Sequence, residues 1–190
     1  RIYGITGDSL NSVNDSLRRN GKIAFEHVRH EETAAFAAGA EASLTGKLTV
    51  CAGSSGPGNL HLINGLFDCH RNRVPVLAIA SHIPQSEVGL NYFQETHPEN
   101  LFKECSCFCE LISNPKQMPE ILFRAMNAAV GNQDVAVIVL PGDVAVMETE
   151  IDELPVWHHP RLPHIVPQRE DIEEMSAHLE KGERITLFCG

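Results

Sequence analysis

The stretch Arg29-His30-Glu31-Glu32 stands where an apolar run, residues 23–28, gives way to an Ala-rich run. A second stretch, Ala52-Gly53-Ser54-Ser55-Gly56-Pro57-Gly58-Asn59, follows the next apolar run. Each is typical of a junction at which a strand ends and a helix begins. In open α/β sheets such junctions lie at the carboxyl edge, where ligands bind. One of these neighbouring junctions carries a carboxylate and the other is rich in glycine. Together they predict a binding site in which each junction contacts one side of a heteroaromatic ring.

Strand-like and helix-like patterns alternate along the first 140 residues of the chain. They predict strands at 2–6, 23–28, 48–52, 74–81, 106–112 and 135–140, and helices at 9–19, 30–44, 59–71, 98–103 and 115–130. Ser9 is expected to cap the first helix. Residues 83–99 are too long for an ordinary connection and predict a functional loop. The fold class expected is α/β, a doubly wound six-stranded parallel sheet with helices on both faces.

The pattern divides the chain into three parts. Residues 1–145 are expected to form one domain whose first helix is missing, because Arg1 stands almost on the first strand. Residues 146–168 are rich in proline and predict an extended linker. Residues 169–190 predict a polar helix at 169–181 and a strand with a glycine turn at 184–190, the start of a second, truncated α/β domain that is too small to fold alone.

Composition narrows the class of protein. Of the 190 residues, 43% are hydrophobic and 21% charged, which favours a packed core over disorder. The net charge of −10 argues against a nucleic-acid partner. We expect no membrane segment, since no apolar run approaches ~18 residues. Without a signal peptide or an initial Met, the chain is expected to be a piece of a longer cytoplasmic protein, with peripheral membrane attachment of the complete protein left open.

Cysteine and histidine spacing predicts no metal site in this chain. The six cysteines are Cys51, Cys69, Cys105, Cys107, Cys109 and Cys189. Zinc sites use a wider spacing than the alternate positions 105, 107 and 109, so buried free thiols are expected instead. His158-His159 lacks partners at ligand spacing, and His30 and His97 are interpreted as structural or supporting residues.

Four segments, taken in order, resemble the N-terminal pyrimidine-binding domain of the thiamine diphosphate-dependent decarboxylase and oxidase family. They are residues 29–39, residues 55–59, Phe93-Gln94-Glu95 and residues 139–144. Three longer stretches are most similar to the pyruvate oxidase branch, the quinone-linked pyruvate dehydrogenases. They are Thr6-Gly7-Asp8-Ser9-Leu10-Asn11, residues 51–54 with residues 58–72, and residues 92–98. The similarity covers nearly the whole chain.

The resemblance implies that Glu31 is the catalytic acid. In the family a glutamate hydrogen-bonds N1′ of the cofactor pyrimidine, so that the exocyclic nitrogen can remove the C2 proton. Helix phase instead favours Glu32, which lies opposite Glu41 on the wheel and would point inward. We adopt Glu31, because the family places the acid directly after the histidine. The structural alternative is an ordinary first-turn acid stabilised by the helix dipole.

The resemblance also assigns the residues around that acid. Gly56, Pro57, Gly58, Asn59 and Asn64 are implied to bind the cofactor, the glycines by leaving the backbone open to the ring. Their structural alternatives are a tight turn, a helix cap and packing.

On the substrate side, Asp8, Phe93 and Gln94 are implied to meet a 2-oxo acid. Helix capping by Asp8 and loop packing by the other two are the structural alternatives.

The function implied is oxidative decarboxylation of pyruvate to acetate and CO2, with electrons passing to a quinone. Thiamine diphosphate, Mg²⁺ and FAD are the implied cofactors. The last two are expected to be held by parts absent here. For Mg²⁺ the reason is that neither Gly7-Asp8 nor Gly142-Asp143 continues into the Gly-Asp-Gly that holds the metal in the family. For FAD the reason is that the flavin domain is expected to lie beyond residue 190. The rival interpretations are an acetolactate synthase-like carboligase and a non-catalytic dimerisation module.

The family builds its site between two subunits, which implies another copy of the chain as partner, in a dimer or tetramer. Leu60, Ile63, Leu66 and Phe67 recur at helical spacing and are expected to help form a symmetric interface. Burial within one domain is the structural alternative.

Overall fold

The computed structural model describes residues 1–150, 156–160, 163 and 165–188. The chain divides into two compact units, Arg1–Pro160 and Arg161–Gly190, and each is described by itself. The first unit is built on a six-stranded sheet of order β2-β1-β3-β4-β6-β5. All five neighbouring pairs are parallel. The strands are β1 (Ile2–Gly4), β2 (Phe25–His27), β3 (Thr49–Gly53), β4 (Val76–His82), β5 (Phe108–Leu111) and β6 (Val135–Pro141).

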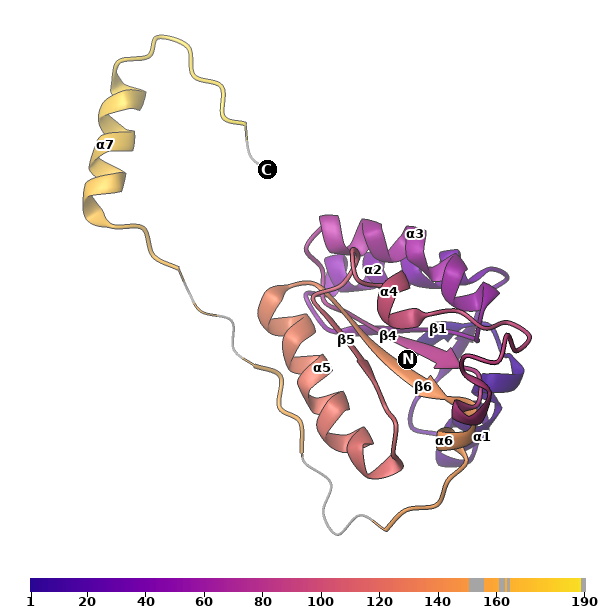
Figure 1. Cartoon of the computed structure of the whole chain (residues 1–190). Helices are drawn as coiled ribbons and strands as arrows, with labels where there is room; N and C mark the ends of the chain where they lie inside the picture. Colours follow the sequence, from indigo (N-terminus) through magenta and orange to yellow (C-terminus); the bar gives the residue numbers. More distant parts are fainter. Residues whose placement is uncertain (151–155, 161–162, 164, 189–190) are drawn as a thin grey trace. The chain divides into compact units, whose positions relative to one another are not determined.

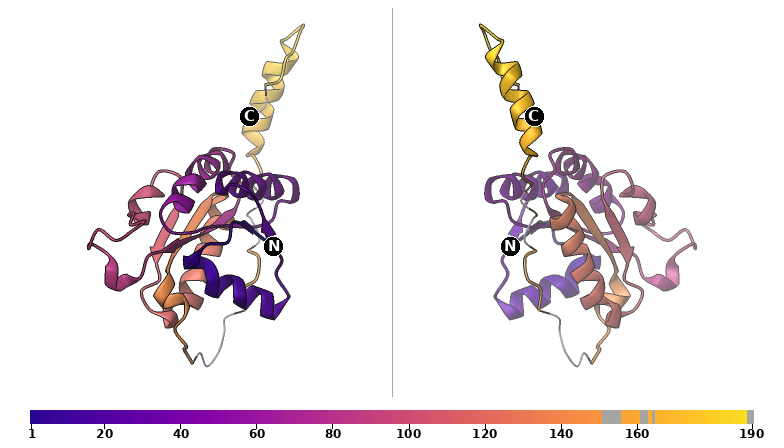
Figure 2. Two further views of the ribbon diagram at one scale, coloured as in Figure 1. Left: turned by 90° about the vertical axis from the view of Figure 1, so that its right-hand side faces the viewer. Right: turned by 90° about the vertical axis from the view of Figure 1, so that its left-hand side faces the viewer.

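Helices cover both faces of this sheet, as Figures 1 and 2 show. One face carries α2 (Glu31–Thr45), α3 (Pro57–Arg71) and α4 (Pro98–Leu101), and the other carries α1 (Asn11–Asn20), α5 (Met118–Asn132) and α6 (Gly142–Ala145). Three 3₁₀ turns, η1 (Asp8–Leu10), η2 (Gln85–Glu87) and η3 (Pro115–Gln117), complete the connections. The predicted fold, a six-stranded parallel sheet flanked by helices, is confirmed.

The central strands explain why the sheet is covered twice. Every residue of β4 and of β6 is buried. Along β4, Val76 and Ala78 face the core under α2 and α3, whereas Leu77 and Ile79 face the core under α1 and α5. Because side chains alternate between the two faces of a strand, a continuous apolar run requires a layer on each side.

Small residues let α2 and α3 pack closely together. A Cβ at Gly65 would lie 2.5 Å from the Cβ of Ala35, and one at Gly39 would lie 2.6 Å from Cys69 Sγ. The Ala-rich sequence of α2 therefore sets a short distance between the two helices. This approach brings the start of α2, with its acidic pair, beside the start of α3.

Several predicted boundaries and one cap were wrong. Ser9 does not cap α1: it lies within η1, and its Oγ accepts a hydrogen bond from Ser55 N–H at 3.0 Å. Helix α3 begins at Pro57 rather than at residue 59, because proline fits the first turn, where its missing N–H is not needed. Strand β5 begins only at Phe108, two residues later than predicted.

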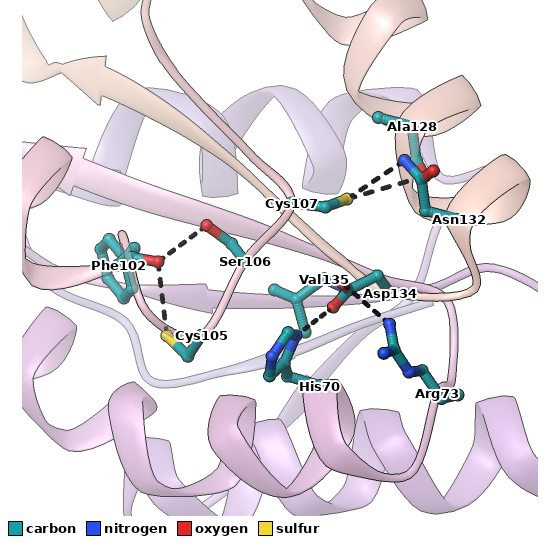
Figure 3. A network of polar contacts seen from close by, with 10 residues as sticks. All are labelled: His70, Arg73, Phe102, Cys105, Ser106, Cys107, Ala128, Asn132, Asp134 and Val135. Atoms are coloured by element: carbon teal, nitrogen blue, oxygen red, sulfur yellow. Dashed lines mark hydrogen bonds and ion pairs between the residues drawn. The ribbon is translucent and has the colours of Figure 1, made fainter.

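A polar network lies at the amino edge of the sheet, where the parallel strands begin (Figure 3). The buried Asp134 carboxylate contacts His70 Nδ1 at 2.7 Å and accepts from Val135 N–H at 2.6 Å. Arg73 adds a longer contact, with its Nη1 3.8 Å from Asp134 Oδ2. The network thereby joins the end of α3 to the start of β6.

The cysteines follow the prediction only in part. Cys51, Cys69 and Cys105 are buried free thiols, and burial raises the pKa of Cys105 to about 11 and that of Cys69 to about 12. Cys109 is partly exposed and Cys107 is exposed, because β5 is the edge strand of the sheet. Cys189 lies outside the described residues.

Beyond β6 the structure describes two features. In the predicted linker, Trp157 donates its Nε1–H to Asn127 Oδ1 on α5 at 3.0 Å. In the second unit, α7 (Arg169–Glu180) is the predicted polar helix. Residues 184–188 are not in a strand, although the sequence pattern predicts one there. The glycine turn predicted at Gly190 lies outside the described residues. Within the described part of the chain, no helix is long and apolar enough to cross a membrane.

Candidate active site

Glu31 is the first residue of α2 and lies at the carboxyl edge of the sheet. His30 precedes it in an extended conformation and caps the helix, its Nδ1 accepting from Glu32 N–H at 3.3 Å. Glu31 is only 8% exposed, whereas the Glu32 side chain is 37% exposed and accepts a hydrogen bond from Asn64 Nδ2. The helix-phase expectation that Glu32 points inward is therefore wrong: α2 includes both residues, and Glu31 is the buried one.

His61 holds one of the two oxygens of the Glu31 carboxyl group. Its Nδ1 lies 3.0 Å from Glu31 Oε2, and its ring stacks on that of His30 with centroids 4.3 Å apart. Sequence reasoning missed His61. The available signal was its position three residues after Gly58, which one helical turn brings to the same side of α3.

The second oxygen, Oε1, lies beside bare backbone. A Cβ at Gly58 would lie 3.3 Å from Glu31 Oε1 and 2.8 Å from Ser54 Oγ. Glycine at this position therefore leaves room next to the acid that any side chain would fill. The two strand-to-helix junctions predicted from the sequence, at residues 29–32 and 52–59, therefore lie next to each other at Glu31 and Gly58.

Gly56 supplies the turn that opens α3. It has φ 66° and ψ −112°, a conformation that side chains other than glycine rarely adopt. A Cβ there would also lie 2.7 Å from the Cβ of Gln94, so the predicted substrate loop packs directly on the Gly/Pro loop. Pro57, between the two glycines, is exposed.

The two asparagines of α3 have different surroundings. Asn59 is buried and donates from Nδ2 to the carbonyl of Ser81 at 2.7 Å, which ties α3 to β4. Its Oδ1 is buried with no hydrogen-bond partner. Asn64 is exposed and binds Glu32 rather than the space beside Gly58.

The three residues predicted to meet the substrate line one cavity of about 360 Å³. Asp8, Phe93 and Gln94 contribute to it together with Ser9, Ser55, His82, Ile83, Pro84, Tyr92 and Gly142. Ser55 Oγ donates to Gln94 Oε1 at 3.4 Å. Gln94 has φ 65°, and such left-handed backbone in a non-glycine residue is found disproportionately at functional loops.

His82, at the end of β4, is a second residue that sequence reasoning missed. It is buried, its Nδ1 has no hydrogen-bond partner, and it lines this cavity. Burial lowers the pKa of His82, while the nearby carboxylates of Glu99 and Glu95 oppose that shift. The available signal was its place directly after the predicted strand 74–81, at the edge where ligands bind.

A further groove, of about 450 Å³, lies on the other face of the sheet and is mainly apolar. Val13, Leu17, Ile112, Met118 and Met147 are among its lining residues. It contains neither Glu31 nor the Gly/Pro loop, so we do not place the chemistry there.

The comparison with known proteins identifies the family. Residues 1–101 match the family model of the thiamine pyrophosphate enzyme N-terminal TPP binding domain. This chain belongs to that family. The matched region contains Glu31, the Gly/Pro loop and the substrate loop, and the domain binds thiamine diphosphate.

Three relatives indicate the range of the similarity. An uncharacterized 42.6 kDa protein from the isoamylase 3′ region of Pseudomonas amyloderamosa is 59% identical over all of this chain and 48% of its own length. Pyruvate oxidase of Lactiplantibacillus plantarum is 32% identical over all of this chain and 32% of its own. The acetolactate synthase isozyme 2 large subunit of Escherichia coli is 29% identical over all of this chain and 34% of its own. The chain thus spans half or less of the length of these relatives.

Proposed function

We propose that this chain is the pyrimidine-binding domain of a pyruvate oxidase, which converts pyruvate oxidatively to acetate and CO2 and passes the electrons through FAD to a quinone. The observation that carries the proposal is the Glu31 carboxyl group, buried beside the space that Gly58 leaves free. The 32% identity with a pyruvate oxidase over the whole chain supports the choice of reaction.

Thiamine diphosphate, when bound, supplies a thiazolium carbon that becomes nucleophilic once its proton is removed. Glu31 would hold N1′ of the pyrimidine through its free oxygen. A positioned acid or base of this kind contributes about 10²–10⁴-fold to a rate. His61 would fix the carboxyl group by holding Oε2, so that Oε1 faces the space beside Gly58.

The residues of the site fit the ring of this cofactor better than its diphosphate. The buried acid and the bare Gly58 suit a flat heteroaromatic group. Mg²⁺ at a diphosphate needs free carboxylate or carbonyl oxygens. The carboxylate of Asp143 already accepts from Gln85 N–H at 3.1 Å and from Val144 N–H at 3.0 Å. We therefore do not place Mg²⁺ at Asp143, and we propose that other parts of the complete enzyme hold both Mg²⁺ and FAD.

A second copy of the chain is the proposed partner, in a dimer or tetramer. The structure corrects the apolar set expected at the interface. Leu66 is buried in the core, and Ile63 and Phe67 are partly buried against it. Leu60 on α3 remains 47% exposed, and Phe36 on α2 is 39% exposed. We place the contact on these two side chains.

An acetolactate synthase-like carboligase is the second candidate, favoured by the 29% identity with such an enzyme. The discriminating experiment gives the complete enzyme pyruvate, thiamine diphosphate, Mg²⁺, FAD and a soluble quinone. Proton NMR then identifies the products. Acetate formed in step with quinone reduction supports the proposal, and acetolactate formed without quinone reduction overturns it.

A further inference from the structure

We propose that His30, Glu31 and His61 form a binding site for a divalent transition metal such as Zn²⁺, and that this metal excludes the cofactor ring. Each residue offers one ligand atom, and the three atoms all lie within 4.8 Å of one another. The metal site stands on this geometry alone. The exclusion rests in addition on the proposed function, since it requires the pyrimidine to bind Glu31.

The ligand types suit zinc. Two histidines and one glutamate form a known zinc ligand set. Ligand atoms that bind one zinc ion at about 2.0–2.2 Å lie about 3–3.5 Å from one another. His61 Nδ1 and Glu31 Oε2 are 3.0 Å apart, so a metal ion would take the place of the proton between them with little movement.

His30 completes the set after a change of ring orientation. The rings of His30 and His61 stack at 25° to each other, so their nitrogens do not yet face one point. The His30 side chain is 47% exposed, which leaves it room to turn. In this structure His30 Nδ1 accepts from Glu32 N–H, so a metal on Nε2 would move the ring proton to Nδ1 and end that contact. The Glu32 carboxylate lies 3.8 Å from Nδ1 and is placed to accept the new N–H. Such a carboxylate behind a ligating histidine is common at metal sites.

The scaffold holds the three residues close to one another before a metal arrives, and only the His30 ring has to turn. His30 and Glu31 stand at the start of α2 and His61 on α3, and these helices pack closely at Gly65. The net charge of −10 also favours the approach of a cation. The site is therefore not an isolated surface cluster.

Metal and pyrimidine would compete for the same carboxyl group. An ion between His61 Nδ1 and Glu31 Oε2 draws charge away from the carboxyl group, so Oε1, which faces the space beside Gly58, becomes a weaker acceptor for N1′. Because coupling between two ligands is reciprocal, Zn²⁺ must weaken cofactor binding by the factor by which the cofactor weakens Zn²⁺ binding.

The test uses Co²⁺ absorption and Zn²⁺ calorimetry on the whole 190-residue chain, with the thiols kept reduced. His30→Asn is the key variant, because asparagine preserves the helix cap while removing the ring. We expect His30→Asn, Glu31→Gln and His61→Asn each to weaken Zn²⁺ binding roughly tenfold or more. The controls Cys107→Ser and His159→Asn should leave it unchanged. Thiolate-to-cobalt absorption, or loss of binding in Cys107→Ser alone, overturns the site.

The exclusion is tested separately in the complete enzyme, by titrating thiamine diphosphate with and without Zn²⁺. We expect Zn²⁺ to lower the cofactor affinity of the wild type and to do so far less in His30→Asn. Zn²⁺ bound at the trio with no effect on cofactor affinity overturns the exclusion. A complete enzyme that binds Zn²⁺ at the trio but never binds thiamine diphosphate overturns the proposed function and leaves the metal site standing.

Discussion

Replacing Glu31 by Gln changes the charge of the proposed catalytic group while nearly preserving its shape. The amide fills the volume of the buried carboxyl group, and its oxygen can still pair with His61 Nδ1, which lies 3.0 Å from Glu31 Oε2. We therefore expect Glu31→Gln to fold normally. The thermal unfolding midpoint of the variant should confirm this before any activity is measured.

The expected loss follows from the one contact that Glu31 would make with the cofactor. A hydrogen bond to a charged group contributes about 1.5–3 kcal/mol. At about 1.36 kcal/mol per factor of ten, that bond corresponds to roughly 10–150-fold. We expect deprotonation at C2 of thiamine diphosphate to slow by about 10²-fold. Glu32→Gln should be much milder, because Glu32 is partly exposed and binds Asn64.

The assay is hydrogen–deuterium exchange at C2 of thiamine diphosphate in the complete enzyme, quenched with acid and measured by proton NMR. Glu32→Gln is the matched control, since it makes the same chemical change one residue further along α2. Unchanged exchange in Glu31→Gln together with collapsed exchange in Glu32→Gln would show that the assignment within the pair is the wrong one.

Three further predictions concern the packing of α2 on α3, the space beside Glu31 and the amino edge of the sheet. Gly65→Ala should lower the unfolding free energy by about 1–3 kcal/mol, because its Cβ would lie 2.5 Å from that of Ala35. Both effects are measured by denaturant unfolding, with Gly131→Ala as the control, because a Cβ at Gly131 would have no atom within 4 Å. The control should stabilise the protein by about 0.5–1 kcal/mol. Equal effects of the two substitutions would refute the packing account. Gly58→Ala should weaken cofactor binding at least roughly tenfold by calorimetry, and an unaltered affinity would remove Gly58 from the site. His70→Phe should cost about 1–3 kcal/mol by leaving Asp134 short of a partner, and a neutral result in urea unfolding would contradict that role.

The sheet could be predicted because its signal is local. Most strands lie in short runs rich in apolar residues, and β4 and β6 are buried on both faces. The predicted ends of helices and strands were less accurate, because these ends depend on tertiary contacts. Strand β5, for example, starts later than its apolar pattern because only part of that run pairs with β6. Residues 184–188 carry a strand-like pattern, but among the described residues they pair with no other strand.

The site was predictable where it lies at junctions. The carboxyl edge of a parallel sheet brings successive strand ends together, so the meeting of Glu31 with Gly58 followed from the order of elements. His61 and His82 were missed because their roles depend on tertiary contacts. The Glu31–His61 pair joins residues 30 positions apart, and the unpartnered Nδ1 of His82 is defined only by burial.

The most direct test of the central claim is an NMR titration of the isotope-labelled 190-residue chain with thiamine diphosphate and Mg²⁺. This chain contributes contacts to the cofactor ring but no ligands for its diphosphate. Those ring contacts must overcome an association cost of about 4–15 kcal/mol, so the affinity for thiamine diphosphate should be about millimolar or weaker. The account predicts weak shifts confined to residues near Glu31 and Gly56–Gly58, which disappear in Glu31→Gln. Shifts centred on the apolar groove around Leu17, or micromolar binding that survives Glu31→Gln, would contradict it.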